Sequence, residues 1–227
     1  MITLYKVGGA VRDKFMELKS KDIDYAVEAN SYQDMVDWIR QHGQIYLEKP
    51  EYFTVRARLN GVDADFVLCR KEGDYSDGRR PESVEVGTIY DDLARRDFTV
   101  NAMAETVNGE LLDPYNGLAD IKVKKLRCVG ITQDRFEEDG LRMLRAIRFS
   151  ITKNLVMSHN IRACLRNSAF IKENMGGVSS DRIREEINRC FAFDMHKTWY
   201  YMREFPAIFD YIFMCTDIKL KMTSETL

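Results

Sequence analysis

The sequence lacks the features that usually identify secreted and membrane proteins. No basic segment followed by an apolar one occurs at the N-terminus, so no secretory signal peptide is expected. The longest apolar run near the other end, FPAIFDYIFMC, contains Asp210 and is far shorter than the roughly 20 residues that a membrane-spanning helix needs. The five cysteines are scattered and include no C-x-x-C pair, which argues against a disulfide framework or a zinc site. We therefore expect a cytoplasmic protein without a membrane partner.

What is present is an ordinary globular composition with an uneven distribution of charge. Hydrophobic residues make up 45% and charged residues 31% of the 227 residues, which suits one large domain or two small ones. Residues 1–120 contain 15 Lys and Arg against 23 Asp and Glu, whereas residues 121–190 contain 15 against 8. The acidic part fits a metal-binding unit and the basic part fits a surface for a polyanion, although solvated helix faces would give the same counts.

Strand and helix signals are mixed up to about residue 130, and only helix signals follow. Strands are expected over residues 2–7, 22–27, 52–59, 62–68 and 110–112, and helices over 10–18, 91–105, 133–149, 159–173, 180–192 and 195–213. Asn60-Gly61 predicts a tight hairpin, and the polar segment 70–87 is predicted to be a mobile loop. We expect an α+β fold with a head domain over residues 1–130 and a helical region over 131–227.

Two pairs of carboxylates stand one residue apart in predicted strands. Because side chains alternate along a strand, Asp22 and Asp24 share a face, and so do Asp63 and Asp65. If the two strands are neighbours, three or four carboxylates converge and provide the hard oxygen ligands that Mg²⁺ prefers. Two such ions could activate an attacking hydroxyl and stabilise a leaving phosphate. The alternative is that these acids only solvate exposed strands, which is the commoner meaning of an isolated D-x-D pair.

The pair Gly8-Gly9 stands where the first strand gives way to a helix. Glycine lets backbone N–H groups approach an anion at such a point, although glycine pairs are also common in simple turns. A dinucleotide-binding turn is disfavoured because G-x-G-x-x-G is absent. In the predicted helix over 91–105, Asp97 and Asn101 share a face. Arg96 could contact a phosphate and Asn101 a sugar hydroxyl, or the segment could be an ion-paired surface helix.

The segment 132–149, TQDRFEEDGLRMLRAIRF, is predicted to be one amphipathic helix. Glu138, Asp139, Arg142 and Arg145 lie on its polar side. An aspartate and an arginine held side by side present acceptors and donors in one plane, which can imitate the pairing edge of a base. The alternative is a simple ion pair within the helix.

Together these stretches resemble the tRNA nucleotidyltransferases (CCA-adding enzymes) and bacterial poly(A) polymerases of the class II nucleotidyltransferase superfamily. VGGAVRD with DID is similar to the family's first motif, RRDFTVNAMA to its second, DPYNGLADI to its third and RFEEDGLRMLRAIRF to its fourth. VSSDRIREEI resembles the helix start that follows, so five motifs occur in order over roughly residues 4–190. The helix after VRD departs from the family pattern, because KFMELKSK replaces the usual leucine pair and glycine.

The resemblance implies a polymerase-β-like head with a small mixed or antiparallel sheet, followed by an all-helical neck and a truncated body. It implies that Asp22, Asp24 and Asp65, with Asp63 as the fallback for Asp65, are catalytic and carry Mg²⁺. The residues that it places at the nucleotide are Gly8 and Gly9 at the triphosphate with Arg12 and Asp13 beside them, Arg96, Asp97 and Asn101 at the ribose and phosphates, and Asp139, Arg142 and Arg145 at the base.

The implied activity is template-independent transfer of CMP or AMP from CTP or ATP to an RNA 3′-hydroxyl, with release of pyrophosphate. The expected RNA is tRNA and the expected addition is CCA. The segment 70–87 matches a loop that helps family members switch from C to A, which disfavours an enzyme that adds only C. Three alternatives stay open: an A-adding enzyme of the poly(A) polymerase type, an enzyme acting on another RNA end, and a module that binds nucleotide without catalysis. The basic neck alone, a partner or a second copy in a homodimer would hold the RNA.

Overall fold

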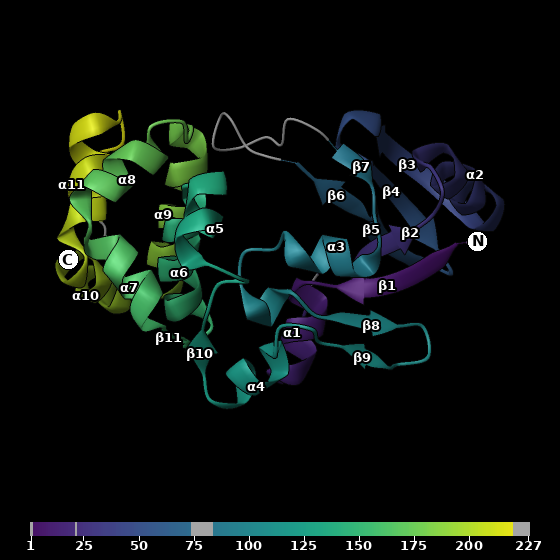
Figure 1. Ribbon diagram of the computed structural model, residues 1–227, viewed down its shortest axis with the longest axis horizontal. Coiled ribbons are helices and arrows are strands. Elements are labelled where there is room, and N and C mark those ends of the chain that lie inside the picture. Colours follow the sequence, from purple (N-terminus) through teal and green to yellow (C-terminus); the bar gives the residue numbers. More distant parts are fainter. Residues whose placement is uncertain (1, 21, 74–83, 220–227) are drawn as a thin grey trace. The chain divides into compact units, whose positions relative to one another are not determined.

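A computed structural model describes residues 2–20, 22–73 and 84–219. They fall into two compact units, one extending to Gly130 and the other starting at Ile131. The first unit contains β1 (Thr3–Val7), α1 (Gly9–Phe15), β2 (Asp24–Glu28), α2 (Tyr32–His42), β3 (Gly43–Lys49), η1 (Pro50–Tyr52), β4 (Thr54–Leu59), β5 (Val62–Leu68), β6 (Arg70–Glu72), β7 (Val84–Val86), α3 (Ile89–Ala94), η2 (Thr99–Asn101), β8 (Ala104–Thr106), β9 (Leu111–Leu112), α4 (Gly117–Lys122) and β10 (Lys125–Leu126) (Figure 1).

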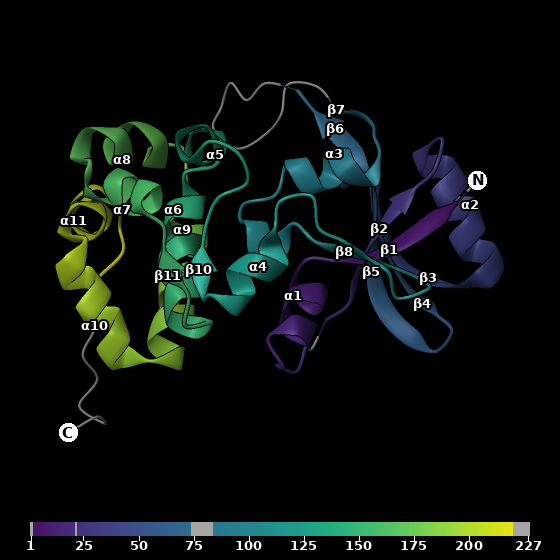
Figure 2. The same ribbon diagram turned by 60° about the horizontal axis from the view of Figure 1, so that its bottom comes forward.

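The second unit consists almost entirely of helices. Its elements are α5 (Thr132–Glu138), α6 (Leu141–Thr152), the short strand β11 (Val156–Met157), α7 (His159–Arg166), α8 (Ser168–Met175), α9 (Ser180–Phe193), α10 (Met195–Glu204) and α11 (Pro206–Cys215). α6 packs along α9 (Figure 2). A buried ion pair between Arg148 Nε and Glu186 Oε2, 2.5 Å apart, joins the two helices. None of the helices in the described parts of the chain has the length and apolar character that crossing a membrane requires.

A seven-stranded mixed sheet forms the centre of the first unit. The strand order is β3-β4-β5-β2-β1-β8-β9 (Figure 1). All neighbouring strands run antiparallel except β2 and β5, which pair in parallel. The α+β class and the mixed sheet expected from the sequence are therefore confirmed.

Two apolar clusters cover the opposite faces of this sheet. In β2, Val27 belongs to the cluster that packs against α2, whereas its neighbour Ala26 belongs to the cluster around α3. Asp24 lies on the same face as Ala26, because side chains alternate along the strand. Asp65 lies on that face too, since Ala64 and Phe66 on either side of it pack in the α2 cluster. One face of the sheet is thus structural core, and the other carries the carboxylates.

The hairpin predicted around Asn60-Gly61 is confirmed. β4 and β5 pair antiparallel, and the two turn residues have φ angles of 50° and 78°, the signs that a tight type I′ turn requires. The sequence analysis missed the neighbouring strand β3. Its pairing with β4 shifts register between Ile45 and Leu47, and most of its residues are exposed, so it lacks the regular alternation that marks a strand.

The prediction of a loop over residues 70–87 is wrong at both ends. β6 and β7 form an antiparallel pair with Arg70 opposite Val86. A two-stranded ribbon can leave polar side chains in water, so polarity did not exclude strands here. The middle of the segment, residues 74–83, lies outside the described residues.

Three of the long helices predicted after residue 130 are each two helices in the structure. The breaks lie between α5 and α6, between α7 and α8, and between α10 and α11. At the first break, a Cβ atom on Gly140 would stand 2.1 Å from the Asn174 carbonyl oxygen, so the chain passes too close for any other residue. At the second, the Asn167 side chain caps α8 by accepting from Phe170 N–H at 3.1 Å. At the third, Pro206 starts α11.

Candidate active site

The parallel pairing of β2 and β5 brings two of the predicted carboxylates together. Asp24 and Asp65 are register partners, and Asp65 N–H donates to the Ile23 carbonyl at 3.2 Å. Both side chains project from the sheet face opposite α2. Asp22 lies just before β2, is exposed, and accepts a hydrogen bond at its carbonyl from Ser20 Oγ at 2.9 Å. The start of β2 and the middle of β5 therefore form one acidic edge.

The electrostatics of this edge favour a cation. Burial, the nearby charge of Asp65 and, more weakly, that of Asp22 raise the pKa of the Asp24 carboxyl above its ordinary value. Repelling carboxylates on a rigid sheet are the oxygen ligands that Mg²⁺ takes, and the residues fit that ion. Over residues 2–20, 22–73 and 84–219, no three acidic, His or Cys side chains are already arranged as a metal cluster. The acidic edge consists of the pair Asp24 and Asp65, with Asp22 nearby.

Asp63, the fallback ligand, has another partner. Its carboxylate accepts two hydrogen bonds from the Arg58 guanidinium, at 2.8 and 2.7 Å, and this contact lowers the pKa of Asp63. Asp65 has only a longer ion pair, with Arg56 Nε at 3.8 Å, and its side chain is 40% exposed. Of the two aspartates, Asp65 is the one that lies beside Asp24.

The glycine pair begins α1 and faces an arginine. Gly8 is the N-cap of α1, with φ 66° and ψ −125°, a combination that L side chains hardly ever adopt. A Cβ atom at Gly8 would also lie 2.8 Å from Arg96 Nη1. Glycine is therefore required twice over, by the backbone and by the guanidinium packed against it.

A buried polar network connects the first and second motifs. Arg12 donates to Asp13 at 2.8 Å and to Asn101 Oδ1 at 2.6 Å, and Asn101 donates to Asp97 Oδ1 at 2.9 Å. All four residues are less than 10% exposed. The structure thus joins these four predicted nucleotide-binding residues to one another, and their contacts fix the loop behind Gly8.

The helix expected over 91–105 is wrong beyond Ala94. α3 ends there, and Asp97 and Asn101 lie on a loop and a short 3₁₀ turn, η2. Their predicted contact nevertheless forms, because the turn brings residues four apart together. The sequence analysis also missed Asp92, a buried residue of α3 whose carboxylate binds the guanidiniums of both Arg95 and Arg96. The sequence pattern that could have identified Asp92 is its spacing of three and four residues from these arginines.

In the second unit, the predicted base-reading residues each have a separate partner. Asp139 follows the end of α5, and its carboxylate lies 2.7 Å from Arg182 Nη2 on α9. Arg142 on α6 donates to Glu138 at 2.5 Å and to the Arg135 carbonyl at 2.9 Å. Arg182 was not foreseen, since it is 43 residues from Asp139 and no local pattern connects them.

Arg145, the third predicted base-contacting residue, also lies on α6. Its guanidinium stands 5.6 Å from the centroid of the Phe149 ring, one turn further along the helix. This contact packs the cation against an aromatic face. Arg142 and Arg145 therefore extend from one helix, whereas Asp139 belongs to the segment before it.

The sequence matches the family model of the Poly A polymerase head domain over residues 4–127. The CCA-adding enzyme of Lactobacillus delbrueckii subsp. bulgaricus is 36% identical over 190 residues, which make up 81% of this chain and 45% of that protein. The chain thus spans about half the length of the curated relatives it matches.

Two solved structures illustrate the structural similarity. The Bacillus stearothermophilus CCA-adding enzyme in complex with CTP aligns with a TM-score of 0.74 and 26% identity over 91% of this chain and 47% of its own. A tRNA nucleotidyltransferase complexed with a primer tRNA and an incoming ATP analog aligns with a TM-score of 0.76 and 28% identity over 96% of this chain and 61% of its own.

Proposed function

This chain belongs to the Poly A polymerase head domain family, and from that premise we propose that it is an RNA 3′-end nucleotidyltransferase. The proposed reaction transfers CMP or AMP from CTP or ATP to a terminal 3′-hydroxyl and releases pyrophosphate. The observation that supports it most is the register pairing of Asp24 with Asp65 on the sheet face opposite α2. Similarity to CCA-adding enzymes favours tRNA as the RNA and CCA as the addition.

The acidic edge is the proposed catalytic centre. Asp24 and Asp65, with Asp22 beside them, would hold Mg²⁺ through carboxylate oxygens. When bound, Mg²⁺ makes the attacking hydroxyl more acidic and offsets the negative charge that develops on the leaving phosphate. Asp24 and Asp65 position this chemistry because both are fixed on strands of the central sheet, where backbone hydrogen bonds limit their movement.

The turn at Gly8 is the proposed triphosphate site. Gly8 is buried with the Arg96 guanidinium packed against it, and that guanidinium provides a positive charge for phosphate oxygens. The network of Arg12, Asp13, Asn101 and Asp97 would hold this turn against η2 and offer polar groups to the ribose. We propose that these four residues lie behind the nucleotide, where they support the turn as well as contact the nucleotide.

The base would be selected by Asp139 and Arg142, with Arg145 supporting them. A carboxylate and a guanidinium can together offer acceptors and donors to the pairing edge of C or A, so no nucleic-acid template is needed. In the structure these groups bind Arg182 and Glu138, and a base would have to exchange with at least part of those contacts. The intramolecular partners hold both side chains ordered before the base arrives.

The assay that tests this proposal incubates the protein with Mg²⁺, labelled CTP or ATP, and tRNA that ends before CCA. Low salt is needed, because binding through Lys and Arg contacts to phosphates weakens steeply as salt rises. Incorporation by the wild type and its loss in Asp22→Ala and Asp24→Ala would support the proposal. Folded wild type that incorporates neither nucleotide into any RNA end would refute it and favour a binding module.

A poly(A) polymerase type of activity is the second candidate. The matched family model takes its name from poly(A) polymerase, which favours an enzyme that adds A. Sequencing the extended 3′ ends after reaction with total RNA separates the two activities. Runs of A on many RNAs would indicate this second activity, whereas CCA on tRNA would indicate the first.

A further inference from the structure

Asp92 is buried between two arginines at the end of α3. It is 1% exposed, and one carboxylate oxygen accepts from Arg96 Nη2 at 2.8 Å while the other accepts from Arg95 Nε at 3.1 Å. Burial alone would raise the pKa of this carboxyl, but the charges of Arg96 and Arg95 outweigh burial and keep the pKa below its ordinary value. Asp92 is therefore an anion that neutralises one of two neighbouring cations.

The position of Arg96 links the two parts of the proposed catalytic centre. Its Nη1 lies 2.8 Å from the position that a Cβ of Gly8 would take, and donates to the Asn101 carbonyl at 3.2 Å. Its charge also reaches Asp24, where it opposes the repulsion from Asp65. Arg96 thus packs against the glycine turn, and its charge also acts on the acidic edge.

We infer that Asp92 is the positioning residue for Arg96: it holds the guanidinium at the Gly8 turn for the nucleotide's triphosphate and prevents it from pairing with Asp24. This inference rests on the proposed function. Four contacts of Arg96 carry it: two hydrogen bonds to Asp92, one to the Asn101 carbonyl, and the packing against Gly8. Without Asp92, the negative charge of Asp24, on which the charge of Arg96 already acts, would attract the guanidinium.

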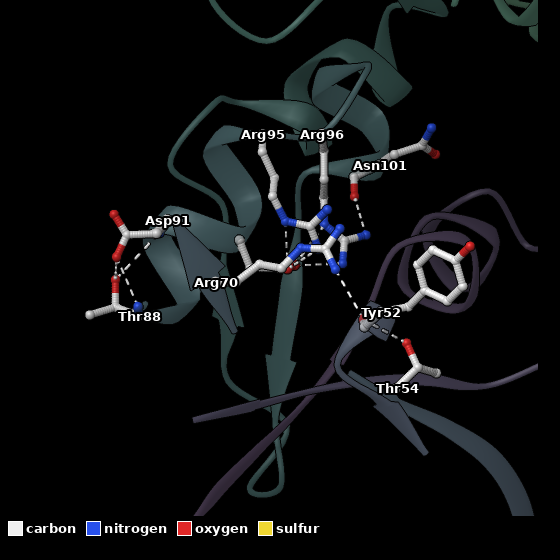
Figure 3. A network of polar contacts seen from close by, with 9 residues as sticks. Tyr52, Thr54, Arg70, Thr88, Asp91, Arg95, Arg96 and Asn101 are labelled. Carbon is white, nitrogen blue, oxygen red and sulfur yellow. Dashed lines mark hydrogen bonds and ion pairs between the residues drawn. The ribbon is translucent and has the colours of Figure 1, made fainter. Parts of the chain in front are cut away.

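The preceding residue, Asp91, provides a matched control. Its carboxylate accepts from Thr88 N–H at 2.8 Å and from Thr88 Oγ1 at 2.7 Å, so it caps the start of α3. Figure 3 shows Asp91 turned toward Thr88, while Arg95 and Arg96 extend side by side in another direction. Two adjacent aspartates on one short helix thus have different roles, and only Asp92 acts on Arg96.

The test measures the affinity for ATP and for CTP in Mg²⁺ buffer by calorimetry, with thermal unfolding as the check on folding. The variants are Asp92→Asn, Arg96→Gln, the double variant Asp92→Asn with Arg96→Gln, and Asp91→Asn. Loss of one charge-assisted phosphate contact predicts about a 10-fold weaker affinity for Arg96→Gln and for Asp92→Asn. The double variant should bind no more weakly than Arg96→Gln alone, because Asp92 acts through Arg96. Asp91→Asn should melt earlier and bind as the wild type does.

Removing a buried anion can prevent folding. The double variant loses one charge of each sign, so it can still be compared with Arg96→Gln if Asp92→Asn does not fold. If it binds clearly more weakly than Arg96→Gln, Asp92 acts by another route and the inference is overturned. Equal affinity of wild type and folded Asp92→Asn also overturns it, while leaving the proposed function intact. Wild type that binds neither nucleotide would instead overturn the proposed function, and this inference with it.

Discussion

Asp24 and Asp65 lie opposite each other on the parallel strands β2 and β5, with both side chains on the sheet face that α2 does not cover. The pair comes from segments about 40 residues apart in the chain, and the strands between them lie elsewhere in the sheet. Bringing two like charges together on a rigid surface disfavours the metal-free fold. A divalent cation would relieve this repulsion between the two carboxylates.

The first prediction concerns the pH dependence of stability without metal. Folding raises the pKa of Asp24, so this group stabilises the fold at a pH below its ordinary pKa of about 4, and the stabilisation is lost as the pH rises through the raised pKa. The free energy of unfolding of the wild type, relative to Asp24→Asn, should therefore fall as the pH rises above about 4. Urea unfolding in chelator at several pH values measures this difference. Curves that stay parallel over the whole range would contradict it.

The second prediction concerns the buried network. Arg12→Met removes the cation from Asp13 and a donor from Asn101, so it should lower the free energy of unfolding by about 3–5 kcal/mol, as breaking a buried ion pair does. Arg58→Met is the control. Arg58 also binds an aspartate through two hydrogen bonds, but that pair is exposed and its loss should change stability little. Equal effects of the two substitutions in urea unfolding would refute the structural role of the network.

The third prediction concerns the glycine turn. Gly8→Ala places a methyl group against Arg96 Nη1 and forces an unfavourable backbone conformation, which costs roughly 1–3 kcal/mol. It should also weaken nucleotide binding, because the guanidinium has to move. Gly61→Ala shares the positive φ but meets nothing within 4 Å, so it should lower stability and leave binding unchanged. Calorimetric titration with ATP distinguishes the two, and unchanged affinity in Gly8→Ala would count against a triphosphate site at this turn.

The fourth prediction concerns base selection. Arg142→Lys keeps the positive charge but loses the planar donor fork. The ratio of CTP and ATP incorporation to UTP and GTP incorporation should fall by about 10-fold or more, since one base contact commonly carries that much discrimination. Arg184→Lys on α9 is the control, because Arg184 is exposed and pairs with Asp181 at 2.6 Å. A preserved ratio in Arg142→Lys would remove Arg142 from base recognition.

The local features of this architecture could be predicted from the sequence. Alternation placed Asp63 and Asp65 on one face of β5, and Asn60-Gly61 located the hairpin, whereas Asp22 lies before β2 and outside the strand expected to contain it. Strand alternation could not decide which of Asp63 and Asp65 stands beside Asp24, because that depends on the register of two strands that are not consecutive in the chain; the family resemblance pointed to Asp65. For the same reason the need for glycine at position 140 could not be predicted, since it comes from the backbone at Asn174.

The same limit applies to the polar contacts. The spacing of Asp92 to Arg95 and Arg96 is visible in the sequence. The packing of Arg96 against Gly8 is not, because these two residues are far apart in the chain. Likewise, Asp139 and Arg142 were expected to lie side by side, and the break between α5 and α6 instead gave each a partner of its own. Short-range spacing predicted some of the local contacts between polar side chains, and long-range packing decided the others.

The most direct test of the account is the Mg²⁺-dependent incorporation of labelled CMP and AMP into RNA by wild type, Asp65→Asn and Asp63→Asn. The two substitutions make the same chemical change two residues apart on one face of β5. The register with β2 predicts that Asp65→Asn loses about 1000-fold or more of the rate, as expected when a metal-binding carboxylate is removed, and that Asp63→Asn retains most of it. Retained activity in Asp65→Asn together with its loss in Asp63→Asn would contradict the account.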